Sequence, residues 1–119
     1  FFHPFQFPER SVDAVGAVEV FEHLAAPMRS LRTLRAHLSP GGVIAGTTDL
    51  WDGSPIGDHV YLDSALHLVY WSPSSLGCAA AQLGLEVALF ELVCPGSVKP
   101  DAKFGWLWPR KRVFFLYPA

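Results

Sequence analysis

The sequence of 119 residues is 50% hydrophobic and 17% charged, a composition typical of one folded domain and unlike that of a disordered chain. Its formal net charge is −2, and its basic residues are scattered apart from the run 110–112, which argues against nucleic acid as a partner. No apolar run approaches the roughly 20 residues of a membrane helix. Phe1–Phe7 also lacks the basic start and long apolar core of a signal peptide. We therefore expect a soluble protein with no membrane partner.

The two cysteines, Cys78 and Cys94, show neither a C-x-x-C pair nor the Cys/His spacing of a zinc site. The plain interpretation is two free, buried thiols in a reducing compartment, so we expect a cytoplasmic location. The stretch that begins at Phe1 is rich in phenylalanine and resembles the middle of a fold more than a solvated terminus. We therefore expect an N-terminal portion to precede it.

The first predicted element is a buried strand over about Ala14–Val20. It follows an extended entry, Phe1–Arg10, in which two prolines disfavour a helix. The short apolar run ends in a cluster of Glu19, Glu22 and His23. Ligands of open α/β sheets gather at the carboxyl ends of such strands, so the cluster is where we expect chemistry.

An amphipathic helix is predicted over Pro27–Leu38, where apolar residues recur at helical spacing. Pro27 suits a first helical position, and Ser39–Gly42 should end the helix through its proline and glycines. Val43–Thr48 is then predicted as a second strand. The order strand, helix, strand favours a right-handed crossover and therefore a parallel pair of strands.

The second half of the chain is predicted to hold one helix and two strands. The long mixed stretch 49–72 has no regular pattern, and loops of this length in compact domains are usually functional. A helix should run from about Ser72 to Leu83. Strands are predicted over Glu86–Val93 and Lys111–Tyr117 and, because no helix separates them, should pair antiparallel.

Three phrases in this order carry a family resemblance: F-P-E-R-S-V-D-A-V at 7–15, E-V-F-E-H-L at 19–24 and L-S-P-G-G-V-I at 38–44. They resemble the second half of the class I S-adenosylmethionine-dependent methyltransferases. The likeness is closest to the branch with E-V-x-E-H-L and L-x-P-G-G segments, as in the ubiquinone-biosynthesis O-methyltransferases.

The resemblance implies an α/β fold, the C-terminal part of a Rossmann-like methyltransferase sheet. Parallel strands four and five would be followed by an antiparallel final pair, with the seventh strand between the fifth and sixth and helices on the faces. Residues 1–119 would be a single partial domain. The family's glycine-rich loop and ribose-binding acidic residue have no counterpart here, and its layout puts them before residue 1.

An incomplete sheet has a physical cost. The first strand would lie in the centre of a complete domain, so in this chain it leaves an unpaired apolar edge. We therefore expect the 119 residues alone to be poorly stable or to self-associate through that edge.

The resemblance implies S-adenosylmethionine as cofactor, bordered by Glu19, Val20 and Phe21. It also associates Glu19, Glu22 and His23 with a divalent metal, although three ligands from one turn make a weak magnesium site. Simpler alternatives are open: Glu19 is a solvated carboxylate, Glu22 caps the next helix, and His23 packs on the surface.

His23 and His67 are the candidate catalytic bases, since imidazole titrates near physiological pH. The stretch 67–72 is similar to a family phrase, H-x-x-x-(Y/F)-S, with one extra residue. The simpler alternatives are turn formation for Asp49 and packing for Trp71. The candidate substrate-binding residues are Asp49, Tyr61, Tyr70 and Trp71.

The first functional hypothesis is methyl transfer from S-adenosylmethionine to an oxygen or nitrogen nucleophile on a small-molecule acceptor. The alternative is a non-catalytic, methyltransferase-like module that binds a partner through its sheet edge. A nicotinamide-dependent enzyme is a third hypothesis, but the glycine fingerprint of that class is absent from these residues.

Overall fold

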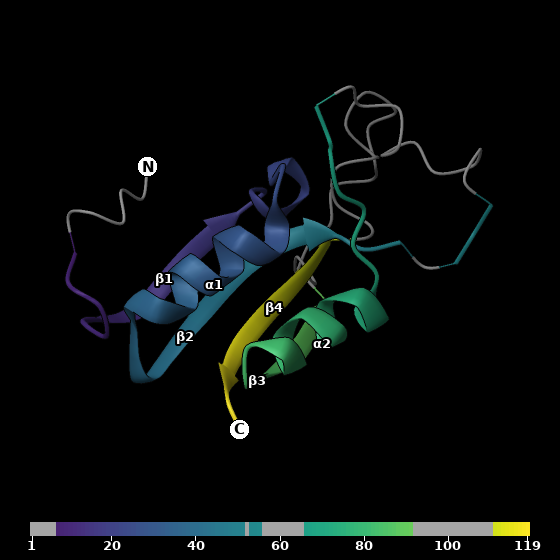
Figure 1. Cartoon of the computed structure of the whole chain (residues 1–119). Coiled ribbons are helices and arrows are strands. Elements are labelled where there is room, and N and C mark those ends of the chain that lie inside the picture. Colours follow the sequence, from purple (N-terminus) through teal and green to yellow (C-terminus); the bar gives the residue numbers. More distant parts are fainter. Residues whose placement is uncertain (1–6, 52, 56–65, 92–110) are drawn as a thin grey trace, which may run out of the picture.

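The structure is a computed structural model that describes residues 7–51, 53–55, 66–91 and 111–119. Within them, four strands form one sheet in the order β1-β2-β4-β3, and two α-helices cover one face of that sheet (Figure 1). The elements are β1 (Val12–Val18), the short 3-10 helix η2 (Phe21–His23), α1 (Pro27–His37), β2 (Leu38–Asp49), α2 (Pro73–Gln82), β3 (Leu85–Glu91) and β4 (Lys111–Pro118).

The strand directions agree with the sequence-based predictions. β1 pairs parallel with β2, and β3 pairs antiparallel with β4. β4 also pairs antiparallel with β2, so the last strand of the chain lies between β2 and β3. The mixed α/β architecture predicted from the sequence is therefore present.

The boundaries of the first two strands differ from the prediction. β1 ends at Val18 because Glu19 takes a positive φ of 51°, which turns the chain out of the sheet. β2 begins at Leu38, directly after α1, because the Pro-Gly-Gly stretch expected to be a turn forms an irregularity in the pairing of the two strands. Gly42 fits there because a Cβ atom would lie 2.9 Å from the carbonyl oxygen of Val12.

α2 begins at a capping box, in which Ser72 and Ser75 each bond the backbone amide of the other. Its buried residues recur three and four positions apart and leave Cys78 free and exposed on the other side of the helix. The expectation of a buried thiol is therefore wrong for Cys78, and Cys94 lies outside the described residues. Neither α-helix of the described part is long and apolar enough for a membrane crossing.

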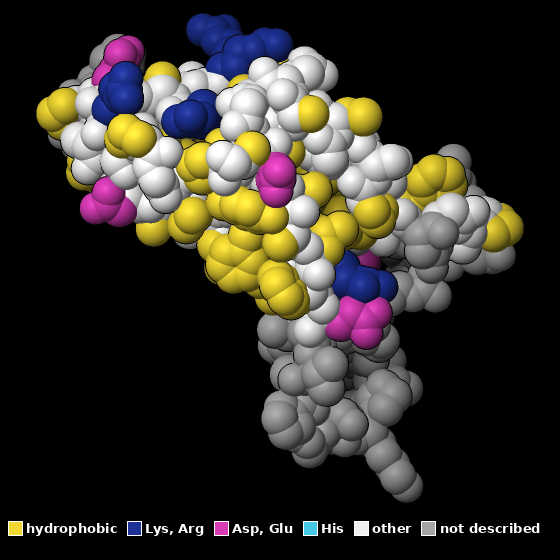
Figure 2. All heavy atoms as spheres, turned by 90° about the horizontal axis from the view of Figure 1, so that it is seen from below, with side chains coloured by type: hydrophobic (Ala, Val, Ile, Leu, Met, Phe, Trp, Pro, Cys, Tyr) yellow, Lys and Arg dark blue, Asp and Glu magenta, His cyan; other side chains and the backbone are white. Residues whose placement is uncertain are grey.

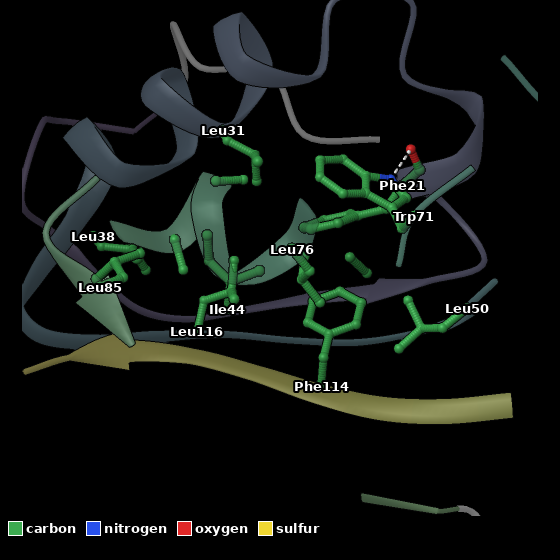
Figure 3. Close-up of a cluster of buried hydrophobic side chains, with 13 residues drawn as sticks. Phe21, Leu31, Leu38, Ile44, Leu50, Trp71, Leu76, Leu85, Phe114 and Leu116 are labelled. Carbon is green, nitrogen blue, oxygen red and sulfur yellow. Dashed lines mark hydrogen bonds between the residues drawn. The ribbon is translucent and has the colours of Figure 1, made fainter. Parts of the chain in front are cut away.

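The core lies between the helices and the covered face of the sheet (Figure 3). Leu31 of α1 and Leu76 of α2 belong to one buried cluster with Ile44, Phe114 and Leu116 of the two central strands. Gly46 is needed in the middle of β2, since a Cβ atom there would lie 2.6 Å from the ring of Phe114 and also meet the backbone of β1. The close contact of β1, β2 and β4 depends on the fact that glycine has no side chain at this position.

The opposite face of the sheet lacks a covering layer among the described residues. Side chains alternate between the faces of a strand, so Ala14 and Val18 point away from the helices while Val15 and Ala17 pack against the core. Val18 is 70% exposed and Phe90 is 56% exposed, with the ring of Phe90 packed edge-on against Phe115 at 5.8 Å. The view from below shows hydrophobic side chains gathered on the surface (Figure 2).

Candidate functional site

The candidate site lies where the parallel strands β1 and β2 end, at the same edge of the sheet. Glu19 turns the chain there in a left-handed conformation that is uncommon for residues other than glycine. Its amide donates a hydrogen bond to the carbonyl of Thr47 over 3.0 Å, and its carboxylate accepts one from the Thr47 hydroxyl over 2.8 Å. The end of β2 thus holds the strained turn after β1 in place.

Phe21 anchors the single helical turn η2 that follows. Its side chain is only 1% exposed, and its ring centroid lies 4.6 Å from that of Phe114 and 6.0 Å from that of Trp71. The indole nitrogen of Trp71 donates to the Phe21 carbonyl over 3.1 Å (Figure 3). This packing fixes the orientation of the two residues that follow Phe21.

Glu22 is the unusual residue of the turn, because a carboxylate that is 1% exposed needs polar partners. Its side chain accepts a hydrogen bond from the Thr48 hydroxyl over 3.2 Å. Its carbonyl accepts from the amides of Leu68 and Val69, at 2.8 and 3.1 Å. Glu22 therefore joins η2 to β2 and to the distant segment 66–71.

The same segment brings the two candidate histidines together. The Nδ1–H of His23 donates to the Leu66 carbonyl over 2.9 Å, and the ring centroids of His23 and His67 lie 4.9 Å apart. One potential ligand atom each from Glu22, His23 and His67 lies within 4.8 Å of the other two. Two imidazoles and a carboxylate at these distances are able to accept a proton or to hold a metal ion.

The other predicted site residues surround this group at different depths. Glu19 lies outside the group of converging ligand atoms, while Val20 beside it is 43% exposed. Tyr61 is outside the described residues.

Three predicted substrate-binding residues are described. Asp49 is buried at the end of β2, with 8% of its surface exposed. Tyr70 is 40% exposed, whereas Trp71 is a core residue at 5%, which agrees with the packing alternative. The alternative in which Glu22 caps α1 does not hold, because the cap residue is Ala26, which receives no side-chain hydrogen bond.

Sequence reasoning did not assign the partners that hold the site. Thr48, which binds the Glu22 carboxylate, was predicted as the last residue of a strand. The only signal was a pair of threonines at the end of an apolar strand. The Leu66 carbonyl, which orients His23, has no signal in the sequence, because backbone groups are the same at every position.

A family model described as a methyltransferase domain matches residues 1–89 of the chain. No curated protein matches it in sequence. Many solved structures resemble it in fold, and the three described next, at 11–19% identity, show the fold alone.

The first is a Haloferax volcanii protein described as a methyltransferase and solved in complex with the Trm112 methyltransferase activator. Its TM-score is 0.69 at 19% identity, over 95% of this chain and 57% of that chain. The second, from Thermotoga maritima, is described as an S-adenosylmethionine-dependent methyltransferase. Its TM-score is 0.69 at 11% identity, over 95% of this chain and 59% of that chain.

The third is an O-methyltransferase from neocarzinostatin biosynthesis, solved with S-adenosyl-L-homocysteine and 1,4-dihydroxy-2-naphthoic acid. Its TM-score is 0.65 at 15% identity, over 99% of this chain and 33% of that chain. The chain thus spans between a third and three-fifths of the length of these structures. From the family match over most of its length and the shared α/β fold, the chain belongs to the methyltransferase domain family.

Proposed function

We propose that the chain is part of an enzyme that transfers a methyl group from S-adenosylmethionine to an oxygen or nitrogen nucleophile on a small molecule. The observation that carries the proposal is the convergence of Glu22, His23 and His67 at the carboxyl ends of β1 and β2 in a methyltransferase domain. The E-V-x-E-H-L and L-x-P-G-G segments support the branch that includes ubiquinone-biosynthesis O-methyltransferases. The neighbour solved with a dihydroxynaphthoic acid is itself an O-methyltransferase.

Glu19, Val20 and Phe21 are the proposed cofactor-binding residues. The left-handed turn at Glu19 presents the backbone of this segment at the strand end, and the half-exposed side chain of Val20 offers an apolar contact. The ring of Phe21 packs in the core, so its contribution is to hold that backbone in place. These residues fit one wall of a cofactor site. The cofactor, when bound, supplies an electrophilic methyl group on a sulfonium.

His23 and His67 are the proposed groups that act on the acceptor. Either imidazole is able to accept the proton of a hydroxyl or amine as it attacks, and a positioned base typically contributes about 10²–10⁴-fold to the rate. Tyr70, exposed beside the site, and Asp49, at the end of β2, are the proposed contacts to the acceptor, together with Tyr61. Trp71 would act by fixing the position of the segment that carries His67.

A non-catalytic interaction module is the second candidate. It is favoured by the apolar face of the sheet on which Val18 and Phe90 are exposed, and by the edge strand β1, either of which offers a surface for a second chain. The Haloferax volcanii neighbour is solved with an activator protein, which supports a partner for this chain as well. Under either candidate we propose a cytoplasmic location.

The decisive experiment is calorimetric titration of S-adenosylhomocysteine into the chain alone and into the chain joined to any segment encoded upstream of it. We expect binding by the longer protein, and methyl transfer to hydroxylated aromatic acceptors followed with a labelled methyl group. His23→Ala and His67→Ala should each lower kcat by about 10²-fold or more without a matching change in cofactor affinity. Failure of both proteins to bind would leave the interaction module as the remaining candidate.

A further inference from the structure

We propose that Glu22, His23 and His67 form a binding site for one divalent transition-metal ion of the Zn²⁺ type. One ligand atom from each residue lies within 4.8 Å of the other two. Two of these residues are neighbours in the sequence and the third comes from a different segment, so the fold assembles the group. Binding of the ion does not depend on whether the chain transfers methyl groups.

Hydrogen bonds to both the backbone carbonyl and the side chain of Glu22 hold the group in place. The Glu22 carbonyl accepts two amide hydrogen bonds from residues 68 and 69, which fixes the segment that carries His67 beside η2. The Glu22 carboxylate is buried and is oriented by Thr48. Metal sites use such outer contacts to hold their ligands in place before the ion arrives.

The tautomer of His23 also suits a metal ligand. A carbonyl oxygen only accepts hydrogen bonds, so the contact with Leu66 places the proton of the neutral ring on Nδ1. Nε2 then carries the lone pair that a metal ion requires. Metal-binding histidines commonly donate their other ring N–H to a backbone carbonyl in this way.

The donor types select the class of ion. Two imidazole nitrogens and one carboxylate oxygen suit Zn²⁺ and its transition-metal neighbours, whereas Mg²⁺ and Ca²⁺ prefer oxygen ligands throughout. In a tetrahedral zinc site the ligand atoms stand roughly 3.4 Å apart, from Zn–N distances of about 2.0–2.1 Å. The separations of up to 4.8 Å must therefore shrink on binding, and the exposed ring of His23 is able to move toward the buried Glu22.

Glu19, the first carboxylate of the E-V-F-E-H-L segment, is not part of the proposed ligand set. It lies outside the converging group, and its carboxylate accepts a hydrogen bond from Thr47. A set of Glu19, Glu22 and His23 would take all its ligands from one turn. The proposed set instead uses His67 to close the site from a second segment.

Three protein ligands leave a coordination position open, as in catalytic zinc sites. If methyl transfer is the function, as proposed above, the open position would take the acceptor oxygen. The ion would then lower the pKa of the acceptor hydroxyl in place of a histidine base.

The test is calorimetric titration of ZnCl₂ into the full chain without cofactor, with Co²⁺ absorption as a second readout of the ligand geometry. We expect one ion per chain, and no competition from an equal concentration of Mg²⁺. His23→Asn and His67→Asn should each weaken binding by more than about 100-fold, since even outer contacts to a metal site are worth 10–100-fold. Glu22→Gln should weaken it too while keeping an acceptor for Thr48.

His37→Asn is the matched control, because His37 bonds the Thr33 carbonyl away from the group, and it should bind Zn²⁺ as the parent chain does. Circular dichroism without metal checks that each variant is folded, and the Co²⁺ spectrum of the parent chain tests the ligand set independently of any variant. Absence of binding by the folded parent chain, or unchanged binding by His67→Asn, would overturn the inference. Zinc binding without cofactor binding contradicts only the proposed function. Cofactor binding without zinc binding contradicts only the metal site.

Discussion

Thr47 and Glu19 form a reciprocal pair of hydrogen bonds across the ends of two parallel strands. The Thr47 hydroxyl donates to the Glu19 carboxylate over 2.8 Å, and the Glu19 amide donates to the Thr47 carbonyl over 3.0 Å. The pair holds a non-glycine residue at a φ of 51° directly before the residues of the candidate site. The position of η2 therefore depends on β2 as well as on β1.

Removing the hydroxyl of this pair should destabilise the chain. Thr47→Val keeps the shape and strand preference of the side chain but loses one hydrogen bond, which is worth about 0.5–1.5 kcal/mol. Urea unfolding followed by circular dichroism measures the difference. Thr33→Val is the control. It removes an exposed hydrogen bond from the Thr33 hydroxyl to the Arg29 carbonyl within α1, and it should lower stability less than Thr47→Val does. Equal losses in the two variants would contradict the role given to the pair.

Gly46 should not tolerate a methyl group. Gly46→Ala places Cβ against the Phe114 ring and the backbone of Ala17, and overpacking of this kind costs about 1–3 kcal/mol or more. The matched control is Gly16→Ala on the neighbouring strand, where a Cβ atom meets nothing within 4 Å. That change should be neutral or stabilising by up to about 1 kcal/mol. Thermal melts of the two variants measure the difference. Similar melting temperatures would contradict the requirement for glycine at position 46.

The uncovered face of the sheet should drive self-association of the chain. Val18→Lys and Phe90→Lys replace apolar side chains that are 70% and 56% exposed, so each should lower association with little effect on unfolding. Sedimentation velocity over a range of concentrations measures the effect. Leu68→Lys, at a residue 59% exposed outside the sheet, is the control and should leave association unchanged. A parent chain that stays monomeric at all concentrations would contradict this prediction.

The phenol of Tyr117 should ionise above its usual pH. Its pKa is raised because its hydroxyl donates to the Glu86 carboxylate on the paired strand, with burial and the charge of Glu86 adding to the effect. A raised pKa in the folded state means that this contact stabilises the fold below pH about 10 and is lost as the pH rises through the folded-state pKa. Glu86→Gln should lower the pKa of Tyr117. The measurement is a pH titration of tyrosinate absorbance, in which the signal of Tyr117 is the part that is absent from the Tyr117→Phe variant. The control Glu91→Gln, which removes an ion pair with Arg112, should not lower this pKa.

Local patterns in the sequence were sufficient for the type and order of the main helices and strands, but not for the bounds of β1 and β2. The spacing of Leu31 and its apolar neighbours predicted α1, the Ser72–Ser75 stretch predicted the start of α2, and the lack of a helix between β3 and β4 predicted their antiparallel pairing. These features depend on neighbours a few residues apart. The E-V-F-E-H-L segment likewise indicated the family before any contact was known.

The site itself depended on contacts between distant residues. Nothing local predicts that Glu19 leaves the strand in a left-handed turn, that Phe21 packs between Trp71 and Phe114, or that His67 meets His23. Each of these features arises from hydrogen bonds or ring packing between segments far apart in the chain, and a local pattern does not encode such pairings. The sequence by itself determined which side chains are available for chemistry, and the tertiary structure decided which of them meet, because only the packed sheet brings the segment 66–71 against the turn after β1.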